Sequence, residues 1–143
     1  MNYINLKKYG LSPRFEQEAT LYPAMFLARV SLQHRDLYKV IGEKGEISAT
    51  VSGKLAYNAG DSTDFPAVGD WVMIDKMDDC SGNAIIHHVL QRKSIFERKA
   101  AGTSKATQIV AANIDVVFIC MSLNADFNLR RLERYLSIAW NSM

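Results

Sequence analysis

The sequence predicts a mainly β protein, in which a small closed five-stranded barrel is followed by the first strand and helix of an incomplete α/β domain. Two observations support this fold class. Five short runs rich in strand-forming residues follow one another between residues 24 and 91, with turn residues between them and no helical period. A single uninterrupted apolar run and an amphipathic helix come after them, which is the pattern of a parallel strand covered on both faces.

Residues 1–23 are interpreted as a lead-in with one short helix. Ser12 is suited to cap a helix N-terminus and Pro13 to occupy the first turn, so the helix should run through Phe15 to Ala19. Pro23 then closes the segment, because proline cannot continue a helix.

Residues 24–91 are expected to form the barrel. Its strands are predicted at residues 25–32, 37–41, 47–55, 70–76 and 84–90. The third is the longest, and Gly53 would let it bend to serve both sides of the closure. Residues 58–69 are rich in Gly, Asp, Ser and Pro and are predicted to be a loop, at a position where many oligonucleotide-binding (OB) folds carry a helix. We therefore expect a five-stranded OB-fold barrel.

Residues 92–110 are interpreted as a basic connector, and residues 111–143 as the start of a second domain. The run from Ile114 to Met121 predicts a buried parallel strand. Asn128 is expected to cap a helix that carries its apolar residues on one face. These residues are Leu129, Leu132, Leu136, Ala139 and Trp140. Without parallel neighbours, the strand is expected to dock on the barrel, to pair with another copy in a homo-oligomer, or to be poorly ordered.

Composition favours a cytoplasmic protein with no membrane partner. No apolar run approaches the roughly 20 residues of a membrane span. The first residues also lack the apolar region of a secretory signal, because Lys7, Lys8 and Arg14 interrupt them. Cys80 and Cys120 lie far apart in the sequence and are expected to be reduced thiols.

The net charge of +2 is unevenly distributed along the chain. Six aspartates and a single lysine lie between residues 60 and 80, whereas the connector is basic and the final helix carries Arg130, Arg131 and Arg134. Lysine and arginine neutralise phosphates, so cations of the connector and of one barrel turn are the candidate RNA-binding residues. They are Arg92, Lys93, Arg98, Lys99, Lys105 and Arg35. The alternative is a plain linker whose cations are solvated.

The sequence offers no legible catalytic or metal site. Gly53-Lys54 is followed by Leu55 and lacks the earlier glycine that a phosphate-binding P-loop requires. The stretch Asp79 to Gly82 has the spacing of a γ-phosphate sensor but falls in a predicted turn. His87 and His88 are adjacent in a strand and leave it on opposite faces, so they cannot share a metal ion. We predict no catalytic residue and no metal ligand in this chain.

Three stretches carry a resemblance to a known family. They are FPAVGDWV (65–72), VLQRKSIFERKAAG (89–102) and QIVAANIDVVFICMSLNADFNLRRLERYL (108–136). In order and spacing they resemble the RsgA/YjeQ family of circularly permuted, ribosome-dependent GTPases, from about residue 25 to the end. The resemblance implies an N-terminal OB domain that docks on small-subunit ribosomal RNA, the opening strand and helix of a GTPase domain, and a role in late small-subunit maturation.

The resemblance also implies what this chain does not supply. The family's guanine-reading motif, P-loop, switch regions and zinc ligands have no matching positions here. GTP, magnesium and zinc are therefore implied for the full-length family only, and this chain alone, with the remainder of the GTPase domain absent, is expected to be inactive. The implied partners are the small ribosomal subunit and its rRNA. The alternative function is an OB-fold protein-interaction module with no nucleic-acid role.

Overall fold

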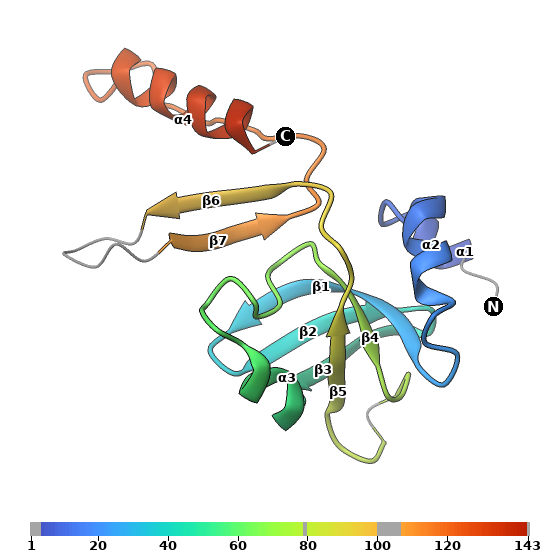
Figure 1. Cartoon of the computed structure of the whole chain (residues 1–143). Helices are drawn as coiled ribbons and strands as arrows, with labels where there is room; N and C mark the ends of the chain where they lie inside the picture. Colours follow the sequence, from blue (N-terminus) through green and yellow to red (C-terminus); the bar gives the residue numbers. More distant parts are fainter. Residues whose placement is uncertain (1–3, 79, 100–106, 143) are drawn as a thin grey trace.

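The computed structural model describes residues 4–78, 80–99 and 107–142. Two short helices, α1 (Ile4–Lys7) and α2 (Pro13–Ala19), precede the barrel. The barrel consists of β1 (Phe26–His34), β2 (Leu37–Gly42), β3 (Gly45–Val51), β4 (Trp71–Ile74) and β5 (Ala84–Val89), with helix α3 (Gly53–Asn58) after β3. A hairpin of β6 (Ile95–Lys99) and β7 (Thr107–Ala112) and the helix α4 (Leu129–Asn141) follow, and lie to the left of α1 and α2 in Figure 1.

The five strands close into a barrel in the order β1-β2-β3-β5-β4. All neighbours are antiparallel except β3 and β5, whose parallel pairing joins Ala49 with Ala84 and Val51 with Ile86. The prediction of a mainly β chain built on a closed five-stranded barrel of the OB type is therefore confirmed.

Alternation along the strands divides the apolar side chains between two cores. The interior of the barrel is filled by small and β-branched residues, among them Val30, Val40, Ile47, Val72 and Ile74. The outer face of β1 and β4 packs against the N-terminal helices, where Phe15 lies 5.9 Å from Trp71 between ring centroids. Both faces of β4 are covered, which is why all four of its residues are buried. Burial on two sides makes β4 the central element of the fold.

The third strand and the segment after it differ from the prediction. β3 ends at Val51, so a strand over 47–55 with a bend at Gly53 is wrong. Ser52 caps α3 by accepting a hydrogen bond from the Leu55 amide at 3.1 Å, and Leu55 packs against the barrel core. The local cap outweighs the strand-like pattern, because it satisfies an amide that the first turn of a helix leaves free. The barrel therefore has a short helix between its third and fourth strands. The N-terminal helix at Pro13–Ala19 is confirmed, and α1 was not predicted.

The segment after the barrel also differs from the prediction. The predicted connector, residues 92–110, contains β6 and most of β7, which pair as a hairpin from Ile95 with Ala112 to Lys99 with Thr107. The predicted strand at Ile114–Met121 is wrong: no helix or strand lies between β7 and α4, and Phe118 is 87% exposed. Val116 and Val117 are also exposed, and the described residues provide no parallel strand to pair with this run. Pairing with another copy of the chain stays a prediction.

The capped helix that follows is confirmed. Asn128 accepts a hydrogen bond from the Arg131 amide at 3.1 Å, and α4 runs to Asn141. Its apolar face is only partly covered, since Leu136 and Trp140 are 53% and 78% exposed. None of the described helices has the length and hydropathy needed to cross a membrane. Cys80 and Cys120 are free and exposed.

Tyr22 stacks on His88 where the N-terminal segment meets β5, with ring centroids 4.3 Å apart. Burial lowers the pKa of His88, and the charges of His87 and Lys54 lower it further. An unfolded histidine titrates near pH 6.5, so the unfolded chain takes up a proton that the folded chain takes up only at lower pH. Stability contributed by neutral His88 is therefore complete above about pH 6.5 and is lost as the pH falls below it.

We expect the free energy of unfolding to fall between about pH 7.5 and about pH 5, and replacing His88 with glutamine to make this fall shallower. His34→Gln is the matched control, because His34 is exposed at the end of β1. Urea unfolding at a series of pH values measures both. An unchanged pH dependence in the His88 variant would contradict the prediction.

Candidate nucleic-acid interface

The β6–β7 hairpin is fixed to the barrel by its backbone at the end next to β5. The Ala112 amide donates to the Val68 carbonyl at 2.8 Å, and the Asn113 amide donates to the Ser94 carbonyl at 2.9 Å. The Asn113 side chain accepts from the Lys93 amide at 2.7 Å. These bonds join the two ends of the hairpin to each other and to the loop before β4. The connector is therefore held as a defined element of structure.

Arg29 joins three parts of the chain at this junction. Its guanidinium donates to the carbonyls of Gly69 at 3.1 Å and Asn113 at 2.9 Å, and also to the carbonyl of Tyr9 in the N-terminal segment. It lies 5.5 Å from the Trp71 ring centroid, a cation–π contact. Burial lowers the pKa of Arg29, and Asp115 and Asp70 act in the opposite direction. Sequence reasoning missed this residue, because a single cation inside a strand gives no signal of three distant carbonyls.

Arg92 is held by the loop before β4. Its guanidinium makes a bidentate contact with Asp70, at 2.7 Å from Nη2 to Oδ2 and 2.9 Å from Nε to Oδ1. It also donates to the carbonyls of Thr63 at 2.6 Å and Phe65 at 2.8 Å. Asp70 is fully buried and accepts one further bond, from the Ala67 amide at 2.8 Å. These contacts use four of the five N–H groups of the Arg92 guanidinium and attach the start of the connector to the barrel.

Among the other candidate residues, Lys93, Arg98 and Arg35 are exposed. Lys93 pairs with Asp115 at 2.7 Å, and hydrogen bonding from the lysine lowers the pKa of that carboxyl. Arg98 is exposed on β6, with its Nη2 3.5 Å from the Gln108 Oε1. The Lys99 backbone pairs with Thr107. Lys105 lies outside the described residues. Arg35 is exposed at φ +51° in the turn between β1 and β2, outside the connector.

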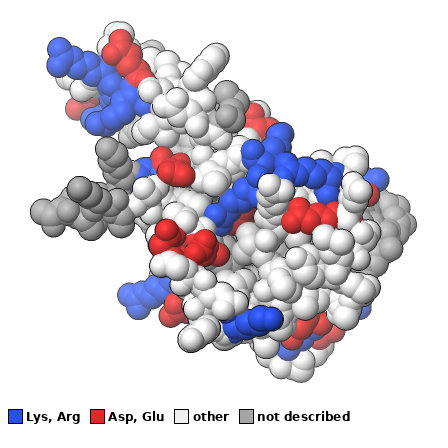
Figure 2. Space-filling model, in the orientation of Figure 1, with Lys and Arg blue, Asp and Glu red and all other residues white. Residues whose placement is uncertain are grey.

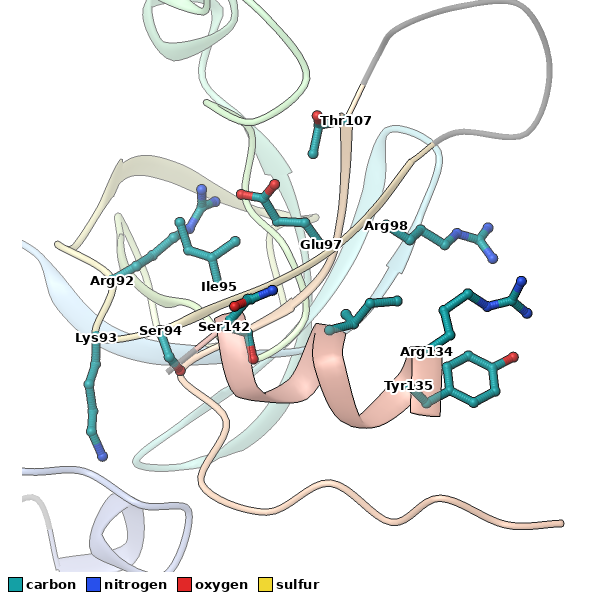
Figure 3. Close-up of a pocket in the computed structure, with 12 residues that line it drawn as sticks. Arg92, Lys93, Ser94, Ile95, Glu97, Arg98, Thr107, Arg134, Tyr135 and Ser142 are labelled. Carbon is teal, nitrogen blue, oxygen red and sulfur yellow. The ribbon is translucent and has the colours of Figure 1, made fainter. Parts of the chain in front are cut away.

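An open groove of about 940 Å³ lies between the hairpin and α4 (Figure 3). It brings together three of the candidate residues, Arg92, Lys93 and Arg98, with Arg134 and Tyr135 of α4. The helix is held against β6 by the Ile95 amide, which donates to the Ser142 carbonyl at 3.3 Å. Arg134 and Tyr135 are absent from the predicted site. The arginines of the final helix were the available signal, but their position over β6 depends on the hairpin.

Acidic side chains gather in the loops of the barrel. Asp61 and Asp64 lie in the loop after α3, where hydrogen bonds from Thr63 lower the pKa of Asp61. Figure 2 shows one group of cations at upper left over α4 and a second near the middle of the face, with acidic side chains beside both. Phosphates would be attracted to the cationic groups and repelled from the loops. Among the described residues, no three His, Cys, Asp or Glu side chains lie close enough to hold a metal ion.

Comparison of the sequence with known proteins finds a matching family and similar proteins. Residues 89–143 match the model of the family described as RsgA GTPase. Small ribosomal subunit biogenesis GTPase RsgA 2 of Lactiplantibacillus plantarum is 50% identical over 139 residues, which are 97% of this chain and 39% of that protein. Small ribosomal subunit biogenesis GTPase RsgA of Opitutus terrae is 41% identical over 119 residues, 78% of this chain and 32% of that protein.

The fold has a solved counterpart. The crystal structure of YjeQ from Thermotoga maritima superposes with a TM-score of 0.58 at 21% identity, covering 82% of this chain and 38% of that one. The chain thus spans less than two fifths of the length of these relatives. The resemblance stated from the sequence is confirmed by the family model and the sequence relatives, and the solved structure confirms the fold. Residues 89–143 match the family model, and the chain is similar to a part of the longer RsgA proteins.

Proposed function

We propose that this chain is the rRNA-binding part of a cytoplasmic GTPase that acts in late maturation of the small ribosomal subunit. The names of two relatives support a role in small-subunit maturation, since the Lactiplantibacillus plantarum and Opitutus terrae proteins are both called small ribosomal subunit biogenesis GTPases. The observation that carries the RNA-binding role is the hairpin, which is fixed to an OB-type barrel and presents Lys93 and Arg98 along one groove. OB barrels commonly bind nucleic acid, and cations on a rigid element neutralise phosphates at defined positions.

The candidate cations divide into two roles. Arg92 is proposed to hold the connector in place, because most of its donors are bonded to Asp70, Thr63 and Phe65. Lys93, Arg98 and Lys99 are proposed to contact phosphates, since they follow one another along the connector. Arg35 would belong to a separate contact on the β1–β2 turn.

GTP hydrolysis is proposed for the longer protein and not for this chain. The GTP, magnesium and zinc implied by the family need a phosphate-binding glycine loop and clusters of acidic, cysteine or histidine ligands. The printed sequence has no P-loop, and the described residues hold no group of metal ligands. The residues present therefore do not fit these groups, and the chain's contribution is the binding of RNA.

Neutralising the connector tests the proposal. In the full chain, a triple variant Lys93→Gln, Arg98→Gln and Lys99→Gln should weaken binding to purified small ribosomal subunits about tenfold or more at moderate salt. The slope of log K against log salt should become shallower by about 2 to 3, because each lost phosphate contact removes about 0.7 to 0.9. The measurement is a sedimentation or filter-binding titration at several salt concentrations.

A second triple variant provides the control for charge. Lys8→Gln, Lys44→Gln and Lys54→Gln removes the same charge from exposed lysines outside the groove, and it should leave the slope nearly unchanged. If both variants behave alike, the connector has no specific role. If binding instead survives nuclease digestion of the rRNA, the chain is a protein-interaction module, which is the alternative function.

A further inference from the structure

One end of the groove combines two cations with an aromatic ring. Arg98 comes from β6, whereas Arg134 and Tyr135 come from the second turn of α4, and all three line the groove. In Figure 3 the side chains of Arg98, Arg134 and Tyr135 extend toward the same end of the groove. The Arg134 guanidinium carbon lies 5.7 Å from the centroid of the Tyr135 ring. A planar aromatic surface is thus placed beside two positive charges.

Tyr135 is available to a ligand. Its side chain is 39% exposed, and the described residues provide no hydrogen-bond partner for its hydroxyl. The ring therefore is not needed to complete a core. A half-exposed aromatic ring next to arginine is the arrangement that proteins use to stack nucleobases while holding the backbone.

We infer that this end of the groove binds an unpaired nucleotide of single-stranded RNA, with its base on Tyr135 and its flanking phosphates at Arg98 and Arg134. The inference rests on the proposed function and adds the kind of RNA that the site selects. The groove volume of about 940 Å³ is within the range of sites that hold small molecules, so it has room for a nucleotide.

The charges that line the groove determine at which end the phosphates of the RNA bind. Glu97 also lines the groove, and in Figure 3 its carboxylate points away from Arg98, toward Thr107 and the Arg92 end. A phosphate would be repelled there and attracted to the end occupied by Arg98 and Arg134. Duplex RNA is excluded from this contact, because its bases are stacked on one another and offer no free ring face.

The test uses the full chain and an unstructured 12-residue RNA labelled at one end, with binding followed by fluorescence anisotropy. Tyr135→Ala should weaken binding about tenfold, and Tyr135→Phe should bind like the parent, because stacking needs only the ring. Arg98→Gln and Arg134→Gln should each make the salt slope shallower by about 0.7, whereas Tyr135→Ala should leave the slope unchanged.

Controls separate the base from the phosphate. An abasic 12-residue strand keeps every phosphate, so Tyr135→Ala should have no effect on its binding. Tyr57→Ala removes a ring that is 90% exposed outside the groove, and Arg130→Gln removes an exposed charge from the same helix outside the groove; both should bind like the parent.

The outcomes distinguish this inference from the proposed function. If the arginine variants weaken binding but Tyr135→Ala does not, RNA binds as a charged strand and the stacking site is refuted, while the proposed function stands. Equal weakening of a duplex and of the single strand by Tyr135→Ala would also refute it. If the parent chain binds none of these RNAs at low salt, the proposed function itself fails.

Discussion

Replacing Arg92 with alanine is expected to destabilise the fold by about 3 to 5 kcal/mol, the cost of leaving a buried charge without its partner. Asp70 is fully buried, and without Arg92 its carboxylate would keep only the bond from the Ala67 amide. The same substitution removes the bonds to the Thr63 and Phe65 carbonyls, so the loop before β4 would lose its contacts with the start of the connector. Urea unfolding of the parent and the variant measures the difference in free energy.

Lys93→Ala is the matched control. Lys93 is adjacent in sequence and forms an ion pair of the same 2.7 Å length with Asp115, but the two side chains are 61% and 66% exposed. Exposed pairs contribute about 0 to 1 kcal/mol, so this variant should unfold almost like the parent. A loss below about 1 kcal/mol for Arg92→Ala would show that the buried pair does not anchor the connector.

Replacing Gly69 with alanine is expected to cost about 3 kcal/mol or more and to loosen the hairpin. Gly69 has φ +91°, and a Cβ there would lie 2.0 Å from the Ala112 carbonyl oxygen. The neighbouring atom is backbone, so it cannot move aside as a flexible side chain would. The Ala112 amide, which donates to Val68, should then exchange with solvent faster, which hydrogen exchange measures together with stability.

Gly82 gives the control for the backbone angle. It has φ +93°, nearly the same as Gly69, but a Cβ there would meet nothing within 4 Å. Gly82→Ala should therefore cost only the left-handed conformation, about 1 to 2 kcal/mol. Equal losses at the two glycines would mean that the close approach of the hairpin contributes nothing beyond the angle.

The barrel could be predicted from the sequence because its signals are local. Turn residues separate five runs of strand-forming residues, and Pro13 and Asn128 mark the starts of two helices. The end of β3 was missed, because the cap at Ser52 competes with a strand pattern that continues through it. Propensity alone does not decide between a local cap and a further strand residue.

The candidate site was less predictable, because it depends on contacts between distant residues. The connector forms a strand only when β7 is beside it, and Arg92 becomes a structural residue only because Asp70 is buried next to it. The apolar run at Ile114–Met121 shows the converse. Its pattern is that of a buried strand, but a strand requires a neighbour, and none of the described residues provides one.

The parallel contact between β3 and β5 has a consequence for the order of folding. β1, β2 and β3 pair through short turns, so they can form a meander at little cost in chain entropy. The contacts of β4 with β1 and of β5 with β3 join residues far apart in sequence. Such contacts form slowly, since the intervening loops must be ordered first. We therefore expect the β4–β5 pair to complete the barrel late, and the hairpin, which is attached to the loop before β4, to acquire its position only after that step.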